Sequence, residues 1–230
     1  MAEAEKQRQA FQFYGRRKGR PLRKGRQFLF DELLPRITIP LSEGLDPATL
    51  FAPEPRAVWL EIGFGGGEHL AHQAASHPDV GFLGCEVFEA GIASGLSHIA
   101  ERNLENVRLH PEDARVLLAA LQPQSLDRVF LLFPDPWPKR RHAQRRFVNR
   151  GNLDRLAELI VAGGELRIAS DDPTYVEWTL QHVPEHPAFQ WQAQGPSDWL
   201  DRPTDAIETR YEKKAREAGR VPHFFRFCRR

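Results

Sequence analysis

The chain has 230 residues, of which 41% are hydrophobic and 27% charged, a balance typical of a globular domain with a sizeable core. Its longest purely apolar run spans only residues 116–121, too short for a membrane-spanning helix, and its two cysteines are too few for a disulfide framework or a four-cysteine zinc site. The formal net charge is +1, yet residues 1–26, 139–150 and 210–230 carry +7, +6 and +6, which leaves −18 on the remaining 171 residues.

These basic segments predict a polyanionic partner, because clustered Lys and Arg side chains concentrate positive potential at defined places. The first belongs to residues 1–30, which we expect to form a basic, partly mobile arm ahead of a single domain over residues 31–230. Aromatic rings beside the cations of the arm either stack on nucleic-acid bases or anchor the arm on the domain. These aromatic residues are Phe11, Phe13 and Tyr14. Residues 1–6 lack the apolar core of a signal peptide, so we expect a cytoplasmic protein.

From about residue 57, short apolar runs alternate with segments of helical periodicity, which predicts a mostly parallel sheet with helices on both faces. The expected strands cover residues 57–62, 80–87, 106–110, 128–133 and 165–170. The expected helices cover the residues around Leu70–Ala75, then 89–102, 114–121 and 151–162, and a stretch that begins at Pro173. Late strands at 189–193 and 221–227 are expected to flank a helix at 204–218 and to pair as an antiparallel edge.

A glycine cluster follows the first strand, in the pattern acid-x-Gly-x-Gly-x-Gly from Glu61 to Gly67. In an open parallel sheet, ligands bind beyond the carboxyl ends of the strands, where glycines permit a tight turn and close approach of the backbone. A dinucleotide would place its phosphates at the start of the next helix, where this chain has the negative charge of Glu68. A ligand without phosphate and with a positive centre fits better, and S-adenosylmethionine (SAM) is such a ligand.

Two further acids follow the second and third strands. Glu86 stands 19 residues after Gly67, where a carboxylate can accept hydrogen bonds from both ribose hydroxyls. The alternative for Glu86 is an ordinary helix N-terminal acid or a surface charge. Asp113 is placed to meet the adenine amino group. Acids after three successive strands therefore predict a SAM site.

The most distinctive segment of the chain follows the fourth strand and reads FPDPWPK over residues 133–139. We expect Asp135 to lie at the end of the central strand, beside the methyl group to be transferred, with the prolines fixing the backbone around it. Six basic residues over 139–150 follow at once. Such a run beside a methyl-transfer centre favours a substrate with a phosphate backbone.

These segments resemble the bacterial tRNA (guanine-N7-)-methyltransferase family, in the family's order and across roughly residues 57–227. The matching motifs are LEIGFG at 60–65, FPDPWPK at 133–139, RHAQRR at 141–146, ASD at 169–171 and TRYE at 209–212. The resemblance implies an α/β, Rossmann-like class I SAM-dependent methyltransferase with a seven-stranded, mostly parallel sheet. It also implies methyl transfer from SAM to N7 of guanine 46 in the variable loop of tRNA, with no membrane and no obligate protein partner.

By motif match, the resemblance implies three groups of site residues. The donor-binding group is Glu61, Gly63, Gly65, Glu86, Asp113 and Asp135, of which Asp135 is also catalytic. The group that contacts the guanine or the adjoining tRNA is Lys139, Asp171, Thr209, Arg210, Tyr211 and Glu212. The group that meets RNA is Arg141, His142, Ala143, Gln144, Arg145 and Arg146. Two points stay open: whether Asp171 or Asp172 contacts guanine, and whether Gly66, where a larger residue is frequent, loosens the loop.

Guanine N7 carries a lone pair and attacks a methyl sulfonium without first losing a proton, so no metal or serine–histidine relay is expected. The enzyme must position two substrates and stabilise charge, tasks that suit Asp135 and Asp171. His69 and His142 are expected to be packing or solvated histidines. Three alternative functions remain. The first is an adenine amino-methyltransferase, whose Asp-Pro-Pro-aromatic motif differs in order from residues 135–138. The others are a non-catalytic RNA-binding protein of the same fold and a small-molecule or protein methyltransferase.

Overall fold

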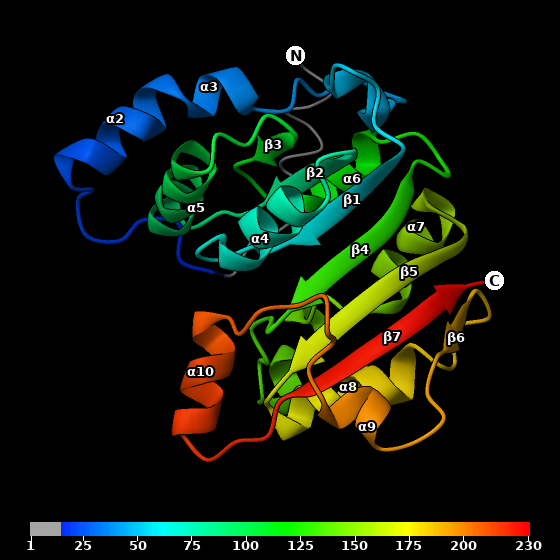
Figure 1. The fold of residues 1–230 in the computed structure, drawn as a ribbon. Helices are drawn as coiled ribbons and strands as arrows, with labels where there is room; N and C mark the ends of the chain where they lie inside the picture. The colour runs from blue at the N-terminus through cyan, green and yellow to red at the C-terminus, as the bar shows by residue number, and fades with distance from the viewer. Residues whose placement is uncertain (1–14) are drawn as a thin grey trace.

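The structure, a computed structural model, describes residues 15–230, so that Phe11, Phe13 and Tyr14 lie outside the described residues. Within residues 15–230, seven strands form one sheet in the order β3-β2-β1-β4-β5-β7-β6 (Figure 1). The strands are β1 (Ala57–Ile62), β2 (Val80–Cys85), β3 (Val107–His110), β4 (Leu126–Leu132), β5 (Ile160–Ser170), β6 (Phe189–Trp191) and β7 (His223–Arg229). Strands β1 to β5 pair in parallel, whereas β7 runs antiparallel to β5 and β6. This confirms the predicted seven-stranded, mostly parallel sheet.

Helices cover both faces of the sheet, as predicted. Those of the described residues are α2 (Lys24–Glu32), α3 (Leu34–Ile37), α4 (Glu68–Ser76), α5 (Glu89–Glu101), α6 (Ala114–Ala120), α7 (Arg150–Leu159), α8 (Pro173–His182), α9 (Ser197–Leu200) and α10 (Arg210–Glu217), with the 3-10 turns η1 (Pro47–Leu50) and η2 (Arg140–Arg145).

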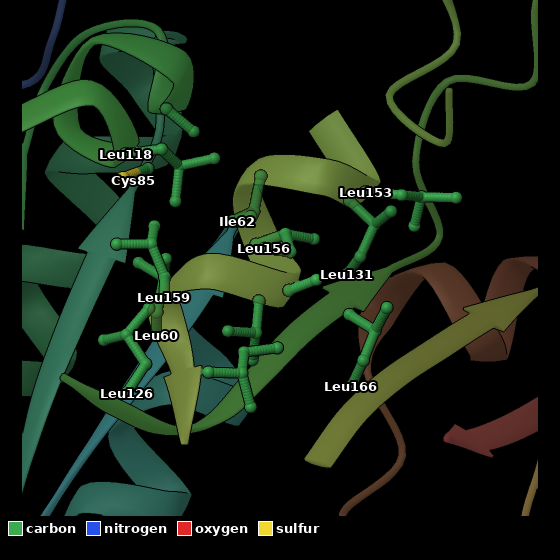
Figure 2. Packing of buried hydrophobic residues seen from close by; sticks show 14 of the residues in the cluster. Leu60, Ile62, Cys85, Leu118, Leu126, Leu131, Leu153, Leu156, Leu159 and Leu166 are labelled. Atoms are coloured by element: carbon green, nitrogen blue, oxygen red, sulfur yellow. The ribbon is translucent and has the colours of Figure 1, made fainter. Parts of the chain in front are cut away.

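Two hydrophobic cores lie on opposite faces of the sheet, because successive side chains of a strand point to opposite faces. Leu60 and Ile62 of β1 join the core that includes leucines of α6 and α7, and Figure 2 shows this packing. Trp59, which precedes Leu60 in the strand, points to the other face and joins the core formed with α4 and α5. Burying each such leucine side chain stabilises the fold by about 2 kcal/mol. The near-continuous apolar runs of the central strands follow from this two-sided burial.

The fifth strand begins earlier than predicted, because Ile160 already pairs with Leu126 of β4. The helix expected over 151–162 therefore ends at Leu159. The pairing shifts register between Leu126 and Arg128 and resumes at Glu165. Gly163, in the left-handed region at φ +80°, lies in this irregular stretch. The prediction placed the start of the strand after the glycines, five residues too late.

The helix expected over 204–218 is shorter, since α10 spans only Arg210–Glu217. The residues before it cross the sheet instead of continuing the helix. Asp205 pairs there with Arg167 at 2.7 Å and with Arg128 at 3.5 Å, both on the sheet. Thr209 is the N-cap of α10, and its hydroxyl accepts from the Glu212 N–H at 3.2 Å. Thr209 therefore lies at the start of the helix and not on its face.

The described part of the expected arm lies along helix α5. Helix α2 runs through residue 30, where we expected the arm to end, and lies along α5 in Figure 1. Its Leu29 and Phe30 pack against the core that contains Leu96 of α5. Ahead of α2, the carbonyl of Arg17 accepts from the N–H of Glu89 at 2.9 Å. The division into an arm and a domain stays a prediction.

Candidate functional site

A hollow of about 180 Å³ opens beyond the carboxyl ends of β1, β2 and β3, beside the loop that follows β4. This is the place that the strand order favours, because β1 has β2 on one side and β4 on the other. The expected site residues that line it are Gly63, Glu86, Asp113, Asp135, Gln144, Arg145 and Arg146. The fold thus brings together the acids that follow β2 and β3 with the acid that follows β4.

The Glu86 carboxylate is held by three backbone donors. Its Oε1 accepts from the N–H groups of Val87 and Phe88, and its Oε2 accepts from the N–H of Gly65, each at 2.8 Å. Burial raises the pKa of Glu86 from its usual value of 4.5; the backbone donors oppose this, and the charge of Asp135 adds to it. A cationic ligand beside these two carboxylates would relieve their mutual repulsion, and Arg115, Arg145 and Arg146 line other parts of the hollow.

Asp113 lines the same hollow but already has partners in the chain. It is the N-cap of α6, where its Oδ1 accepts from the Arg115 N–H at 2.9 Å. Its Oδ2 also lies 2.6 Å from Nη2 of Arg115. Asp113 therefore lies at the edge of the hollow with part of its accepting capacity in use, and its contact with adenine stays a prediction.

Glu61 lies beneath the glycine loop, apart from the main hollow. It is 4% exposed and lines a smaller hollow together with Gly63, Thr209 and Tyr211. Its Oε2 lies 2.8 Å from Nδ1 of the equally buried His69. The sequence analysis missed this partner of Glu61. A histidine beside Leu70 on the apolar face of the next helix is the signal for it, because a buried imidazole needs a polar partner.

The start of α10 covers the glycine loop. A Cβ placed on Gly65 would lie 2.7 Å from Cε2 of the Tyr211 ring, and one on Gly66 would overlap the Arg210 guanidinium. Arg210 also pairs with Glu68 and donates to Ser94 Oγ at 3.2 Å. At Gly66 the missing side chain therefore makes room for Arg210. The TRYE motif and the glycine loop, far apart in sequence, form one surface.

Glu212 is 1% exposed and forms two ion pairs. Its carboxylate oxygens lie 3.0 Å from Nε of Arg202 and 3.0 Å from Nη2 of Arg216. It lines a cavity of about 420 Å³ between the sheet and the segment before α10, to which Thr209 and Phe133 also contribute. Sequence reasoning missed Arg202, which lies in a connection without regular structure.

The two neighbouring acids after β5 have different partners. Asp172 is the N-cap of α8, and its Oδ1 accepts from the N–H groups of Thr174 and Tyr175. An aspartate directly before a helix-starting proline is a typical cap, so this role was readable from the sequence. Asp171 pairs with Arg220 at 2.5 Å and lines a separate groove beside α8. The structure does not place Asp171 in the hollow that contains Asp135.

The loop after β4 presents Asp135 and the basic run to the surface. Its Phe133 and Trp137 adopt left-handed φ angles of +49° and +42°, so the loop turns sharply on either side of the exposed Asp135. The Arg145 guanidinium lies 4.9 Å from the Trp137 ring centroid. The exposed members of the basic run and its flank are Lys139, Arg140, Arg141 and Gln144, while His142 and Ala143 are half-buried.

His142 and Arg146, both in the basic run, are not fully solvated cations. Partial desolvation, followed by the charges of Arg145 and Arg141, lowers the pKa of His142. Arg146 is only 4% exposed, and its guanidinium faces backbone carbonyls of the loop. The sequence grouped Arg146 with the RNA-contacting residues, whereas the structure places it inside the protein.

The described residues offer neither a metal cluster nor a membrane-spanning helix. No group of three His, Cys, Asp or Glu side chains within residues 15–230 is arranged to hold a metal ion. No helix over the same range is long and apolar enough to cross a membrane.

Comparison with known proteins gives close relatives over nearly the whole chain. Residues 55–224 match a family described as "Putative methyltransferase". The tRNA (guanine-N(7)-)-methyltransferase of Rhodospirillum rubrum is 56% identical over 231 residues, which cover 98% of this chain and 91% of that protein. The protein of the same name from Brucella anthropi is 47% identical, and the match covers 99% of each chain.

Solved structures share the fold at low sequence identity. The 16S rRNA (adenine(1408)-N(1))-methyltransferase from Catenulisporales acidiphilia has a TM-score of 0.55 at 17% identity, covering 84% of this chain and 97% of that one. An rRNA methylase from Streptococcus thermophilus has a TM-score of 0.51 at 14% identity, covering 92% and 97%. These likenesses show a Rossmann-like class I methyltransferase fold. Together with the close relatives, they establish that the chain belongs to the tRNA (guanine-N7-)-methyltransferase family.

Proposed function

We propose that this protein transfers a methyl group from SAM to N7 of a guanine in the variable loop of tRNA, in the cytoplasm. The observation that carries the proposal is a hollow whose lining includes the carboxylates of Glu86 and Asp135, directly beside the exposed cations of η2. A positively charged donor suits the hollow, and a phosphate backbone suits the cations. The base and the atom come from the names of the relatives, which are called tRNA (guanine-N(7)-)-methyltransferases.

The residues of the hollow fit a SAM molecule. Gly63, at φ +70°, lines the hollow, and a Cβ placed on it would meet nothing within 4 Å. Its backbone is therefore open to close approach by a ligand. Glu86 accepts one backbone hydrogen bond on Oε2 and two on Oε1, which leaves accepting capacity on Oε2 for a ribose hydroxyl.

When bound, SAM supplies an activated methyl group, and its transfer moves one positive charge from sulfur to the guanine ring. We propose that Asp135 lies beside the methyl group during transfer and stabilises the moving positive charge. Its carboxylate is exposed in the hollow, and its charge contributes to the raised pKa of Glu86. No side chain needs to remove a proton, since N7 carries its lone pair from the start. The chain's task is therefore to hold the two reactants in line.

The surface around Asp135 also offers a place for the guanine. Tyr211 is 44% exposed, and burial, followed by the charge of Glu86, raises the pKa of its hydroxyl, with Asp135 contributing. Its ring also faces Gly65, whose N–H donates to Glu86. We propose that the guanine stacks near Tyr211, with Lys139 and Arg141 on the flanking phosphates.

The test is transfer of labelled methyl from SAM to unmodified tRNA at a series of salt concentrations. We expect transfer to tRNA whose KM rises steeply with salt, and no transfer to a mixture of proteins or small molecules. SAM binding without transfer to any RNA would contradict the proposal. The matched control is Arg141→Gln, which should weaken tRNA binding without altering SAM affinity.

A further inference from the structure

Arg146 differs from the other cations of the basic run in burial and in partners. Its Nε donates to the carbonyl oxygen of Pro136 at 3.1 Å, and its Nη2 donates to the carbonyl oxygen of Trp137, also at 3.1 Å. One planar guanidinium thus spans two successive carbonyls of the loop that carries Asp135. Such a two-pronged contact requires the fork of donors that arginine has and lysine lacks.

The loop needs donors from elsewhere because of its composition. Pro134, Pro136 and Pro138 have no N–H, so alternate residues of the loop cannot donate backbone hydrogen bonds. Trp137 is also held in the left-handed region at φ +42°, a conformation that costs a non-glycine residue free energy. Contacts from outside the loop must therefore hold this turn, and Arg146 supplies two of them.

The guanidinium is fixed on its other side by α8. It lies 4.4 Å from the centroid of the Trp178 ring, and the Trp178 indole N–H donates to the carbonyl oxygen of Val148 at 2.7 Å. Trp178 is therefore anchored to the chain just beyond Arg146. The result is a continuous connection from α8, through a buried guanidinium, to the turn directly after Asp135.

We propose that Arg146 is a positioning residue, which holds the turn at Pro136 and Trp137 so that Asp135 faces the reacting groups, and that it does not contact RNA. The inference rests on the proposed function. It assigns the last arginine of the motif a role different from that of the exposed Arg141, although the two side chains are chemically identical.

The test compares Arg146→Lys with Arg141→Lys and Arg141→Gln in the full-length protein, using unmodified tRNA. For Arg146→Lys we expect kcat at saturating SAM and tRNA to fall roughly 100-fold, because a small misplacement of a reacting group has effects of that size. The tRNA dissociation constant and its dependence on salt should match wild type. Arg141→Gln should instead weaken tRNA binding and reduce the salt slope by about one. Arg141→Lys keeps the charge but loses the arginine fork, so it should weaken tRNA binding less than Arg141→Gln does.

A second pair of variants tests the same connection without changing a cation. Trp178→Phe keeps a ring beneath the guanidinium but loses the donor to Val148, so it should lower kcat less than Trp178→Leu, which removes the ring as well. Both variants should keep the tRNA affinity of wild type. If Arg146→Lys does not fold, as judged by circular dichroism and a melting curve, this pair decides the question. Wild-type kcat in Arg146→Lys or in folded Trp178→Leu would overturn the inference, as would a loss of tRNA affinity in Arg146→Lys equal to that in Arg141→Lys. Failure of the proposed function is distinguishable, because wild type itself would then transfer no methyl group to tRNA.

Discussion

The Oε2 atom of Glu86 accepts a hydrogen bond from the backbone N–H of Gly65 at 2.8 Å, which joins the end of β2 to the glycine loop after β1. The carboxylate that we expect to bind the donor thus also shapes the loop that faces the donor. Replacing it affects both functions at once, and this links the geometry of the loop to SAM affinity.

Glu86→Gln should weaken SAM binding about 10- to 100-fold, because an amide has one accepting oxygen where the carboxylate has two. Its NH₂ group would also face a backbone donor. Calorimetric titration with SAM measures the effect, and a melting curve shows whether the fold is kept. An unchanged dissociation constant for SAM would contradict the proposal that Glu86 binds the donor.

Acidification should weaken SAM binding earlier than expected for an exposed glutamate. Burial raises the pKa of Glu86 above its usual value of 4.5, so the neutral form becomes populated at a higher pH. The neutral carboxyl accepts hydrogen bonds less well and carries no charge to attract the sulfonium, hence affinity falls as pH falls through the raised pKa. The dissociation constant for SAM, measured from neutral pH down to the acid limit of folding, should show this fall. Glu86→Gln should lack that fall, and an identical profile in both proteins would assign the effect to another group.

Gly65→Ala and Gly163→Ala form a matched pair, because both glycines have positive φ, +56° and +80°. Each substitution should cost about 1–2 kcal/mol of folding free energy through backbone strain. Only the Cβ at Gly65 would contact the Tyr211 ring, since the one at Gly163 meets nothing within 4 Å. We therefore expect methyl transfer to fall in Gly65→Ala alone. Equal activity of the two variants in the same assay would show that the contact between the glycine loop and α10 does not affect methyl transfer.

Glu212→Ala should lower the free energy of unfolding by about 1.5–3 kcal/mol, because it removes a buried acceptor from Arg202. Arg216→Ala is the control. Its side chain is half-exposed and its loss leaves the Glu212–Arg202 pair intact, so it should cost about 0–1 kcal/mol. Denaturant titration of both variants gives the comparison. Equal losses of unfolding free energy in the two variants would show that the Glu212–Arg202 pair does not stabilise the fold.

Asp135→Asn should lower kcat about 10²- to 10³-fold, the size of effect seen when one group aimed at developing charge is removed. The shape of the loop should persist, since Arg146 binds the carbonyls of Pro136 and Trp137 and leaves the Asp135 side chain free of its contacts. Single-turnover rates with SAM and tRNA both saturating measure this. Full turnover by the variant would exclude Asp135 from catalysis.

The edge of the sheet that carries the site was predictable from the sequence. Strands buried on both faces are near-continuous apolar runs, and the residues that end them follow directly. Glu86, Asp113 and Asp135 could therefore be placed at one edge of the sheet from the sequence, and in the structure they line one hollow. Chemical type and position relative to a strand suffice for that conclusion.

Partners supplied by distant elements were not predictable. Arg145 and Arg146 are identical in type and adjacent in sequence, and the buried contacts of Arg146 include the ring of Trp178, on a helix far along the chain. Glu61 likewise required the placement of α4 against β1 before His69 became its partner. The start of α10 depended on Asp205, whose arginine partners lie on strands. Such tertiary pairs leave no periodic signal in the local sequence.

Nucleoside analysis of methylated tRNA tests the central claim most directly. Unmodified tRNA with a guanine in the variable loop, and the same tRNA with that guanine replaced by adenine, are each incubated with the protein and SAM and then digested to nucleosides. We predict 7-methylguanosine from the first tRNA and none from the second. A methylated nucleoside of any other kind, or 7-methylguanosine in equal amount from both tRNAs, would contradict the account.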